Sequence, residues 1–203
     1  MKTPHMLLIS SVFVAALSAQ AGAQQKRFEI DNQKNKYRNV ASIESVADFE
    51  TFTGKTNDVS GTISFDPSTR KGFGKIVVDP SGIDTGIPLR NEHMRSEGWL
   101  DTKKYPEIVF EAEKVQPLKG DDYKVTGKFT LHGVTHKITT NVRVRYHVAD
   151  ETTKKVGFEG DVVQLSTKFT IALSDYGIKL PAMVAGKVAK DVTISLSSYA
   201  VSK

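Results

Sequence analysis

The sequence contains no cysteine. Disulfide bonds and thiolate metal ligands are therefore excluded. A lipoprotein is excluded as well, because no thiol is present to be acylated. The absence of cysteine does not indicate the compartment, since a domain of about 180 residues buries about 70% of its unfolded surface and is stable without disulfides.

Long apolar runs are also scarce. Residues 6–19 form an apolar run of about fourteen residues, whereas a helix that spans a bilayer needs roughly twenty. Lys2 and His5 precede this run, and the small-x-small pattern of residues 21–23 follows it. We therefore predict a signal peptide over residues 1–23, a mature domain over residues 24–203, and export to the periplasm or the medium. An uncleaved membrane anchor is the alternative.

Several sequence signatures of catalysis and of cofactor binding are missing. There is no Gly-x-Ser-x-Gly, and residues 72–74 (Gly-Phe-Gly) lack the further glycines and the helix that a dinucleotide site needs. His132 and His136 have a spacing that suits a metal only on a helix, but they flank a predicted turn, and no third ligand is obvious. We expect no enzyme, no cofactor and no metal site.

The net charge of +5 does not indicate a nucleic-acid partner. Lys and Arg alternate with Asp and Glu along the predicted strands, which is typical of an ordinary solvated surface. A basic stripe with interleaved aromatic residues is not visible.

What the sequence does contain is β-strand material. Apolar and polar residues alternate in short segments between turn signals, which predicts antiparallel strands. The predicted strands are residues 28–31, 37–43, 59–66, 71–78, 107–115, 123–131, 135–147, 156–173 and 190–199, with residues 49–54 a connection or a short strand. The fold class is therefore all-β: a single antiparallel closed barrel of about eight strands, lipocalin-like, with a short helical segment near 88–98.

The most distinctive stretch is residues 91–110. It holds the only tryptophan, Trp99, and a polar cluster that includes Asn91, His93 and Arg95. These three residues are candidates for binding a polar or phosphorylated headgroup, since the Arg guanidinium suits phosphate. Alternatively they bind loop carbonyls and fix the cover over one end of the barrel.

Three segments of the chain carry a family resemblance. Residues 91–101 with 104–112, residues 127–135, and residues 174–178 with 192–194 resemble the signatures of the YceI-like family of exported lipocalin-like proteins. The resemblance spans residues 28–199. It implies an antiparallel barrel with a long apolar pocket for a polyisoprenoid or related amphiphile, in a protein that is exported.

An apolar inner surface is what such a pocket requires. An eight-stranded barrel is either filled by its own side chains or able to hold one small ligand, and both alternatives stay open here. The partner expected from the resemblance is a long-chain isoprenoid or other amphiphilic lipid, with only transient membrane contact; a homodimer and a structural envelope protein are the alternatives. Candidates for the inward face are Phe65, Ile76, Val78, Trp99, Phe110, Phe129, Val142, Val144, Phe158, Phe169, Ile171, Ile194 and Leu196.

Overall fold

The computed structural model describes residues 25–31 and 33–203. The predicted signal peptide and its cleavage site lie outside this part of the chain. The described strands are β1 Lys26–Ile30, β2 Val40–Val46, β3 Thr51–Thr56, β4 Val59–Asp66, β5 Lys71–Val78, β6 Ile108–Pro117, β7 Asp122–Leu131, β8 Val134–His147, β9 Val162–Ala172 and β10 Asp191–Ser202. The helices are α1 Pro88–Arg95 and α2 Glu151–Lys155, with short 3-10 turns η1 Lys36–Arg38, η2 Pro80–Gly82, η3 Leu173–Tyr176 and η4 Ala182–Val184.

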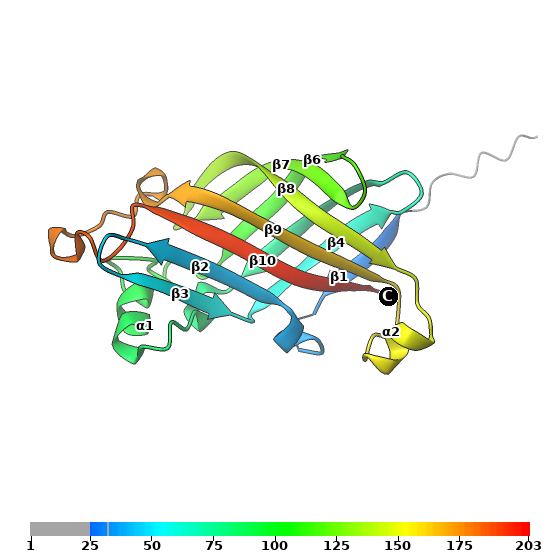
Figure 1. The fold of residues 1–203 in the computed structure, drawn as a ribbon, viewed down its shortest axis with the longest axis horizontal. Helices are drawn as coiled ribbons and strands as arrows, with labels where there is room; N and C mark the ends of the chain where they lie inside the picture. The colour runs from blue at the N-terminus through cyan, green and yellow to red at the C-terminus, as the bar shows by residue number, and fades with distance from the viewer. Residues whose placement is uncertain (1–24, 32) are drawn as a thin grey trace, which may run out of the picture.

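The strands form one antiparallel sheet that closes on itself. The strand order is β1-β4-β5-β6-β7-β8-β9-β10-β2-β3, and a further pairing of β1 with β10 completes an eight-stranded barrel. Residues 193–197 of β10 pair with β2, while residues 201–202 pair with β1. The β2–β3 hairpin therefore extends the wall of the barrel at one end, which it shares with α1 and η4, whereas α2 lies at the opposite end (Figure 1).

Alternating burial along the strands follows from the two-residue period of a β-strand. In β7 the buried residues Tyr123, Val125, Phe129 and Leu131 face inward, and exposed lysines occupy positions between them. The prediction of a closed antiparallel barrel with a short helix in its cover is confirmed. The two strands beyond eight come from the β2–β3 hairpin.

The two ends of the barrel are packed by separate apolar clusters. At the end near α2, Phe28 and Phe65 pack against Tyr146 and Tyr123 in a cluster that also includes Val59. At the end near α1, a second cluster joins inward residues of β7 and β9 to side chains of the cover, among them Met94, Leu100 and Tyr176. The middle of the barrel lies between these clusters.

Two predicted strand boundaries are wrong, and local polar bonds explain both. The strand predicted over residues 156–173 begins only at Val162, because the N–H groups of residues 156–158 donate to carbonyls of α2 instead of to a neighbouring strand. The strand predicted from Tyr37 begins at Val40, after η1. β2 pairs with both β10 and β3.

Candidate functional site

A cavity of about 170 Å³ occupies the middle of the barrel. This is larger than the engineered cavity of about 150 Å³ that admits benzene in another protein. It is therefore not a packing defect of the size of one water molecule. The sequence left open whether side chains fill the barrel or leave room for a ligand, and in the structure the interior is not filled.

Most of the predicted inward residues line this cavity. They are Phe65, Ile76, Val78, Phe110, Phe129, Val142, Val144, Phe169, Ile194 and Leu196. Ile76, Val142, Val144 and Leu196 point into the barrel yet keep part of their surface uncovered. Inward side chains of a filled core would be covered by their neighbours, so this remaining surface is the wall of the cavity.

Three predicted residues lie elsewhere. Ile171 belongs to the cluster at the α1 end, and Trp99 lines a smaller second pocket. Phe158 lies between α2 and β9, where its ring stacks on Tyr199 at 5.7 Å and the Arg38 guanidinium lies 4.6 Å from its centroid. The prediction that Phe158 lies on the inner face is therefore wrong. Phe158 precedes the start of β9 at Val162, and the alternation of a strand does not apply to a residue outside a strand.

The surface that the cavity wall presents is almost wholly apolar and carries no charge. No Asp, Glu, Lys, Arg or His is among its lining residues in the described part of the chain. The hydroxyls of Thr140 and Thr167 lie 3.0 Å apart, and Thr167 also donates to the Asn141 carbonyl. Thr56 Oγ1 accepts from the Asp58 N–H. A charged ligand group would find no partner inside, and its transfer there would be unfavourable.

Two inward glycines of β5, Gly72 and Gly74, contribute to the free space. Each occupies an inward position and lines the cavity with backbone only. A Cβ on Gly72 would lie 2.6 Å from the Ser64 carbonyl oxygen, too close for any side chain without a shift. Sequence reasoning missed these residues as wall residues, although the period of two along residues 71–78 places them on the inner face.

The wall next to these glycines lacks a hydrogen-bond ladder. β5 pairs with β6 only through residues 75–78, and β6 has a bulge between Ala112 and Lys114. We call residues 71–74 and 112–117 the seam. Arg70 bridges its open end: its side chain donates to the carbonyls of Leu118 and Gly120 and to the Tyr123 hydroxyl, and its guanidinium lies 4.8 Å from the Tyr123 ring centroid.

A second, smaller pocket of about 30 Å³ lies at the α1 end. It shares the lining residues Ile43 and Leu100 with the main cavity, so the two spaces adjoin at these side chains. Trp99 lines this second pocket together with Val188 from the loop before β10.

The three headgroup candidates on α1 line neither space. Asn91 is buried: its Oδ1 accepts from the N–H and hydroxyl of Thr85, at 2.8 and 2.7 Å, and its Nδ2 donates to Asp84 at 2.6 Å. Arg95 donates to the Ser81 carbonyl at 2.9 Å, and His93 is exposed. The geometry of Asn91 and Arg95 matches the alternative interpretation, in which they fix the cover.

His132, in the β7–β8 turn, and His136, near the start of β8, both contact backbone carbonyl oxygens. His132 Nδ1 lies 3.1 Å from the Tyr176 carbonyl oxygen, and His136 Nε2 lies 2.9 Å from that of Asp175. They connect the turn to η3. Over the described residues, no three His, Asp or Glu side chains are grouped closely enough to hold a metal ion.

The fold and its interior define a class: a small antiparallel barrel that encloses an apolar cavity. The YceI-like domain matches residues 28–200 of the chain. A protein of Pseudomonas aeruginosa (strain LESB58), described as a UPF0312 protein, is 32% identical over 148 residues, which cover 71% of each chain. Protein YceI of Escherichia coli O17:K52:H18 is 30% identical over the same share. The chain therefore belongs to the YceI-like family.

Solved structures share the fold. BcnA of Burkholderia cenocepacia superposes with a TM-score of 0.70 at 22% identity, covering 84% of this chain and 98% of that one. A polyisoprenoid-binding domain from Saccharophagus degradans, implicated in plant cell wall breakdown, superposes with a TM-score of 0.63 at 15% identity, covering 89% and 100%. At these identities the likeness concerns the architecture alone.

Proposed function

We propose that this protein is exported and holds the apolar chain of an isoprenoid or similar amphiphile inside its barrel, for transport, storage or sequestration. The observation that carries the proposal is the cavity of about 170 Å³, whose wall is uncharged and presents an almost wholly apolar surface. Such a wall favours hydrocarbon and excludes a charged headgroup. The headgroup of the ligand therefore stays outside the cavity.

The size of the hydrophobic effect limits which ligands bind usefully. Burying about 400 Å² of a prenyl chain contributes on the order of 10 kcal/mol before losses. Association costs at least about 4 kcal/mol. The remaining ~6 kcal/mol corresponds to a Kd of tens of micromolar, so a physiological ligand needs a longer chain than this.

Two further observations support binding rather than catalysis. The solved domain from Saccharophagus degradans is described as polyisoprenoid-binding. The cavity of the present chain presents no carboxylate, imidazole or amine in its described lining, and acid–base chemistry needs such a group within hydrogen-bond reach of the substrate.

The experiment has two arms. Protein purified from its host without detergent is extracted and its lipid identified by mass spectrometry. Delipidated protein is then titrated with an isoprenoid alcohol of defined length. We expect one bound lipid per chain and an affinity that rises with chain length.

A matched pair of variants locates the site. Val142→Phe adds bulk at the cavity wall, and Val109→Phe makes the same change on β6 at a position outside the cavity lining. We expect Val142→Phe to weaken binding at least about tenfold, or 1.4 kcal/mol, and Val109→Phe to leave it unchanged. Empty purified protein that takes up no isoprenoid would overturn the proposal, as would equal affinities of the two variants.

Export and oligomeric state are tested separately. The export proposal expects cell fractionation to recover a chain that starts at Gln24 outside the cytoplasm. A cytoplasmic chain that keeps Met1 would contradict it. For the homodimer, light scattering on the purified protein gives the mass directly.

A further inference from the structure

An exposed apolar surface covers the end of the molecule next to the second pocket. Phe49, in the β2–β3 turn, is 86% exposed, and Met183, in η4, is 81% exposed. Met183 belongs to an uninterrupted run of apolar residues, 180–186 (Leu-Pro-Ala-Met-Val-Ala-Gly). We call Phe49 and residues 181–185 the apolar tip.

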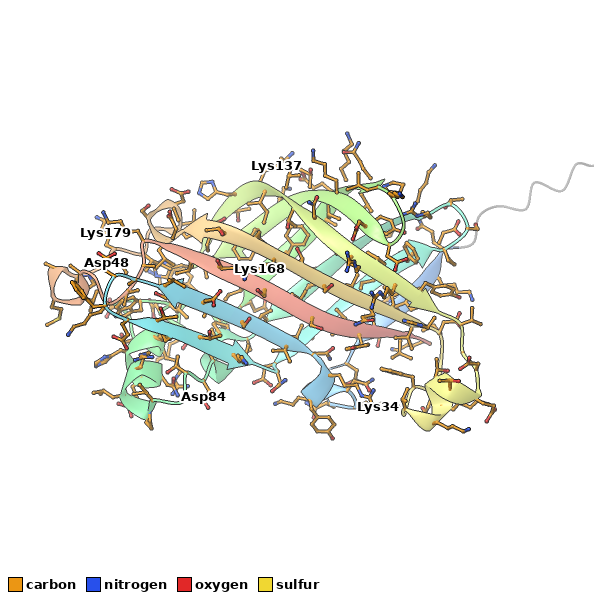
Figure 2. The ribbon with its side chains drawn as sticks, in the orientation of Figure 1. Lys34, Asp48, Asp84, Lys137, Lys168 and Lys179 are labelled. Atoms are coloured by element: carbon orange, nitrogen blue, oxygen red, sulfur yellow. The ribbon has the colours of Figure 1, made fainter. Side chains whose placement is uncertain are left out.

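The two parts of the apolar tip lie side by side. The Phe49 N–H donates to the Gly186 carbonyl at 2.9 Å. A Cβ on Gly186 would lie 2.7 Å from the Phe49 ring, so the absence of a side chain there allows the contact. In Figure 2, Asp48 and Lys179 mark this end of the molecule. Bonds within η4, from the N–H groups of Val184 and Ala185, hold the backbone while Met183 points to solvent.

Three lysines border residues 181–185 of the apolar tip. Between Asp175 and Asp191 the chain has no acidic residue and three lysines, Lys179, Lys187 and Lys190. All three are exposed, and none makes an ion pair with a described residue. Two acids, Asp48 and Glu50, flank Phe49 in the sequence, and Glu50 pairs with Arg90 of α1.

The opposite end differs although it also exposes an aromatic ring. Tyr37 is 81% exposed there. Two basic residues near it pair with acids, Lys36 with Asp58 and Lys154 with Glu151, and the Arg38 guanidinium donates to the Val156 carbonyl. The continuous apolar run 181–185, bordered by three exposed lysines that make no ion pair with a described residue, therefore distinguishes the apolar tip.

The apolar tip also leads toward the interior. Val188, in the same loop, lines the second pocket, and its neighbour Ala189 donates its N–H to the buried Ser45 hydroxyl at 2.9 Å. That pocket shares Ile43 and Leu100 with the main cavity. An apolar chain that left the cavity through this pocket would emerge beneath the loop.

We propose that the apolar tip docks on a phospholipid surface that carries anionic headgroups, and that this end of the barrel exchanges its ligand with the membrane. Phe49 and Met183 insert among the acyl chains while the three lysines contact headgroups, as in other interfacial anchors. The docking rests on the proposed lipid-binding function, and its test separates the two.

The first experiment measures vesicle binding by the mature protein. Vesicles contain phosphatidylcholine alone, or with one third phosphatidylglycerol. We expect binding to the anionic vesicles that weakens with salt. Phe49→Ser with Met183→Ser should reduce binding at least about tenfold, and Tyr37→Ser, the matched change at the other end, should not reduce it.

A second measurement does not depend on these variants. Because the chain has no cysteine, Met183→Cys and Tyr37→Cys each carry a single environment-sensitive fluorophore. We expect a blue shift with anionic vesicles only for the label at position 183. Equal shifts at both positions, or no shift at either, would overturn the docking proposal.

The remaining outcomes are distinguishable. Protein that loads isoprenoid alcohol from solution but ignores vesicles overturns the docking and leaves the proposed function standing. Protein that binds vesicles through the apolar tip but holds no lipid overturns only the proposed function. A dimer that dissociates in the Phe49→Ser, Met183→Ser variant would assign the apolar tip to a second copy of the chain and overturn the membrane assignment.

Discussion

Asp161 illustrates how single residues close the barrel at the α2 end. Its carboxylate accepts bonds from Lys26 Nζ at 2.6 Å, the Tyr146 hydroxyl at 2.7 Å and the Ala149 N–H at 2.8 Å. These donors come from β1, from β8 and from the connection after β8. One side chain thus joins the first strand to strands that follow it by more than a hundred residues.

The bonds to Asp161 predict a loss of stability in acid. The Lys26 ammonium is the main cause that lowers the pKa of this carboxyl from 3.8 to about 2, followed by the Ala149 N–H. Because the folded state favours the charged form, the stabilisation is complete above about pH 5 and is lost as the pH falls through 3.8 towards 2. Its size is on the order of 2 kcal/mol.

Urea unfolding between pH 2 and pH 7 measures this effect. In Asp161→Asn the unfolding free energy should fall less over this range than in the wild type. The fall that remains in the variant reflects other groups, such as Asp66, whose pKa is also about 2 because Ser68 and Thr69 donate to its carboxylate. Asp48→Asn, at an exposed carboxyl, should keep the full fall. Identical pH profiles for Asp161→Asn and the wild type would contradict the assignment.

Asn91 is the second residue whose role can be separated experimentally. Replacing it by alanine leaves the Thr85 N–H and hydroxyl and the Asp84 carboxylate without this partner. We expect Asn91→Ala to lower the unfolding free energy by roughly 1–3 kcal/mol and to leave isoprenoid affinity unchanged. His93→Ala, at an exposed position of the same helix, should change neither quantity. A loss of affinity without a loss of stability would restore the headgroup role.

At the scale of elements, β5 and β6 pair over only part of their length, and the seam is the unpaired part. Only residues 75–78 pair with β6, and Arg70 spans the gap from the β4–β5 turn to the β6–β7 turn. Its backbone φ of 57° is unusual for a residue with a side chain. We infer that the contacts of the guanidinium hold this conformation in place.

Arg70→Ala should therefore loosen the seam. Loss of the bonds to two carbonyls and to the Tyr123 hydroxyl should lower stability by roughly 1–3 kcal/mol. Hydrogen exchange should accelerate at residues 71–74 and 112–117 more than in β7. Arg143→Ala, which removes an exposed ion pair with Asp122 from an intact ladder, should cost less than about 1 kcal/mol. Uniform exchange across the barrel in Arg70→Ala would contradict a local role.

At the scale of the whole molecule, two packed ends flank an unfilled middle. The apolar clusters hold the barrel closed without a ligand, while the middle leaves apolar surface for one to cover. No helix in the described residues is long and apolar enough to cross a bilayer. Ligand binding should consequently add stability to a fold that already exists, rather than cause folding.

This expectation has a measurable size. At a free isoprenoid concentration of 100 times the Kd, binding adds about 2.7 kcal/mol to the unfolding free energy. For a domain of this length the melting temperature should rise by roughly 5–10 °C. Scanning calorimetry of delipidated protein with and without the alcohol tests this. Val142→Phe should show a smaller rise, and an equal rise would place the ligand outside the cavity.

The sequence by itself determined the sheet and the faces of its strands. Alternation along residues 59–66, 71–78 and 123–131 gave the strands and assigned Phe65, Ile76 and Phe129 to the interior, since a strand has a period of two whatever it pairs with. The resemblance of residues 91–112 and 127–135 added the family. Where the chain is not yet a strand, as over residues 156–161, alternation misled, and Phe158 was assigned to the wrong face.

The tertiary structure alone decided whether the interior is filled. Volume depends on how side chains from different strands meet across the barrel, and no periodicity along one strand contains that information. The same holds for Asn91 and Arg95, whose partners Thr85 and Ser81 lie in a segment that the fold brings against α1. Local pattern fixes which way a side chain points, whereas the packing of distant segments fixes what it meets there.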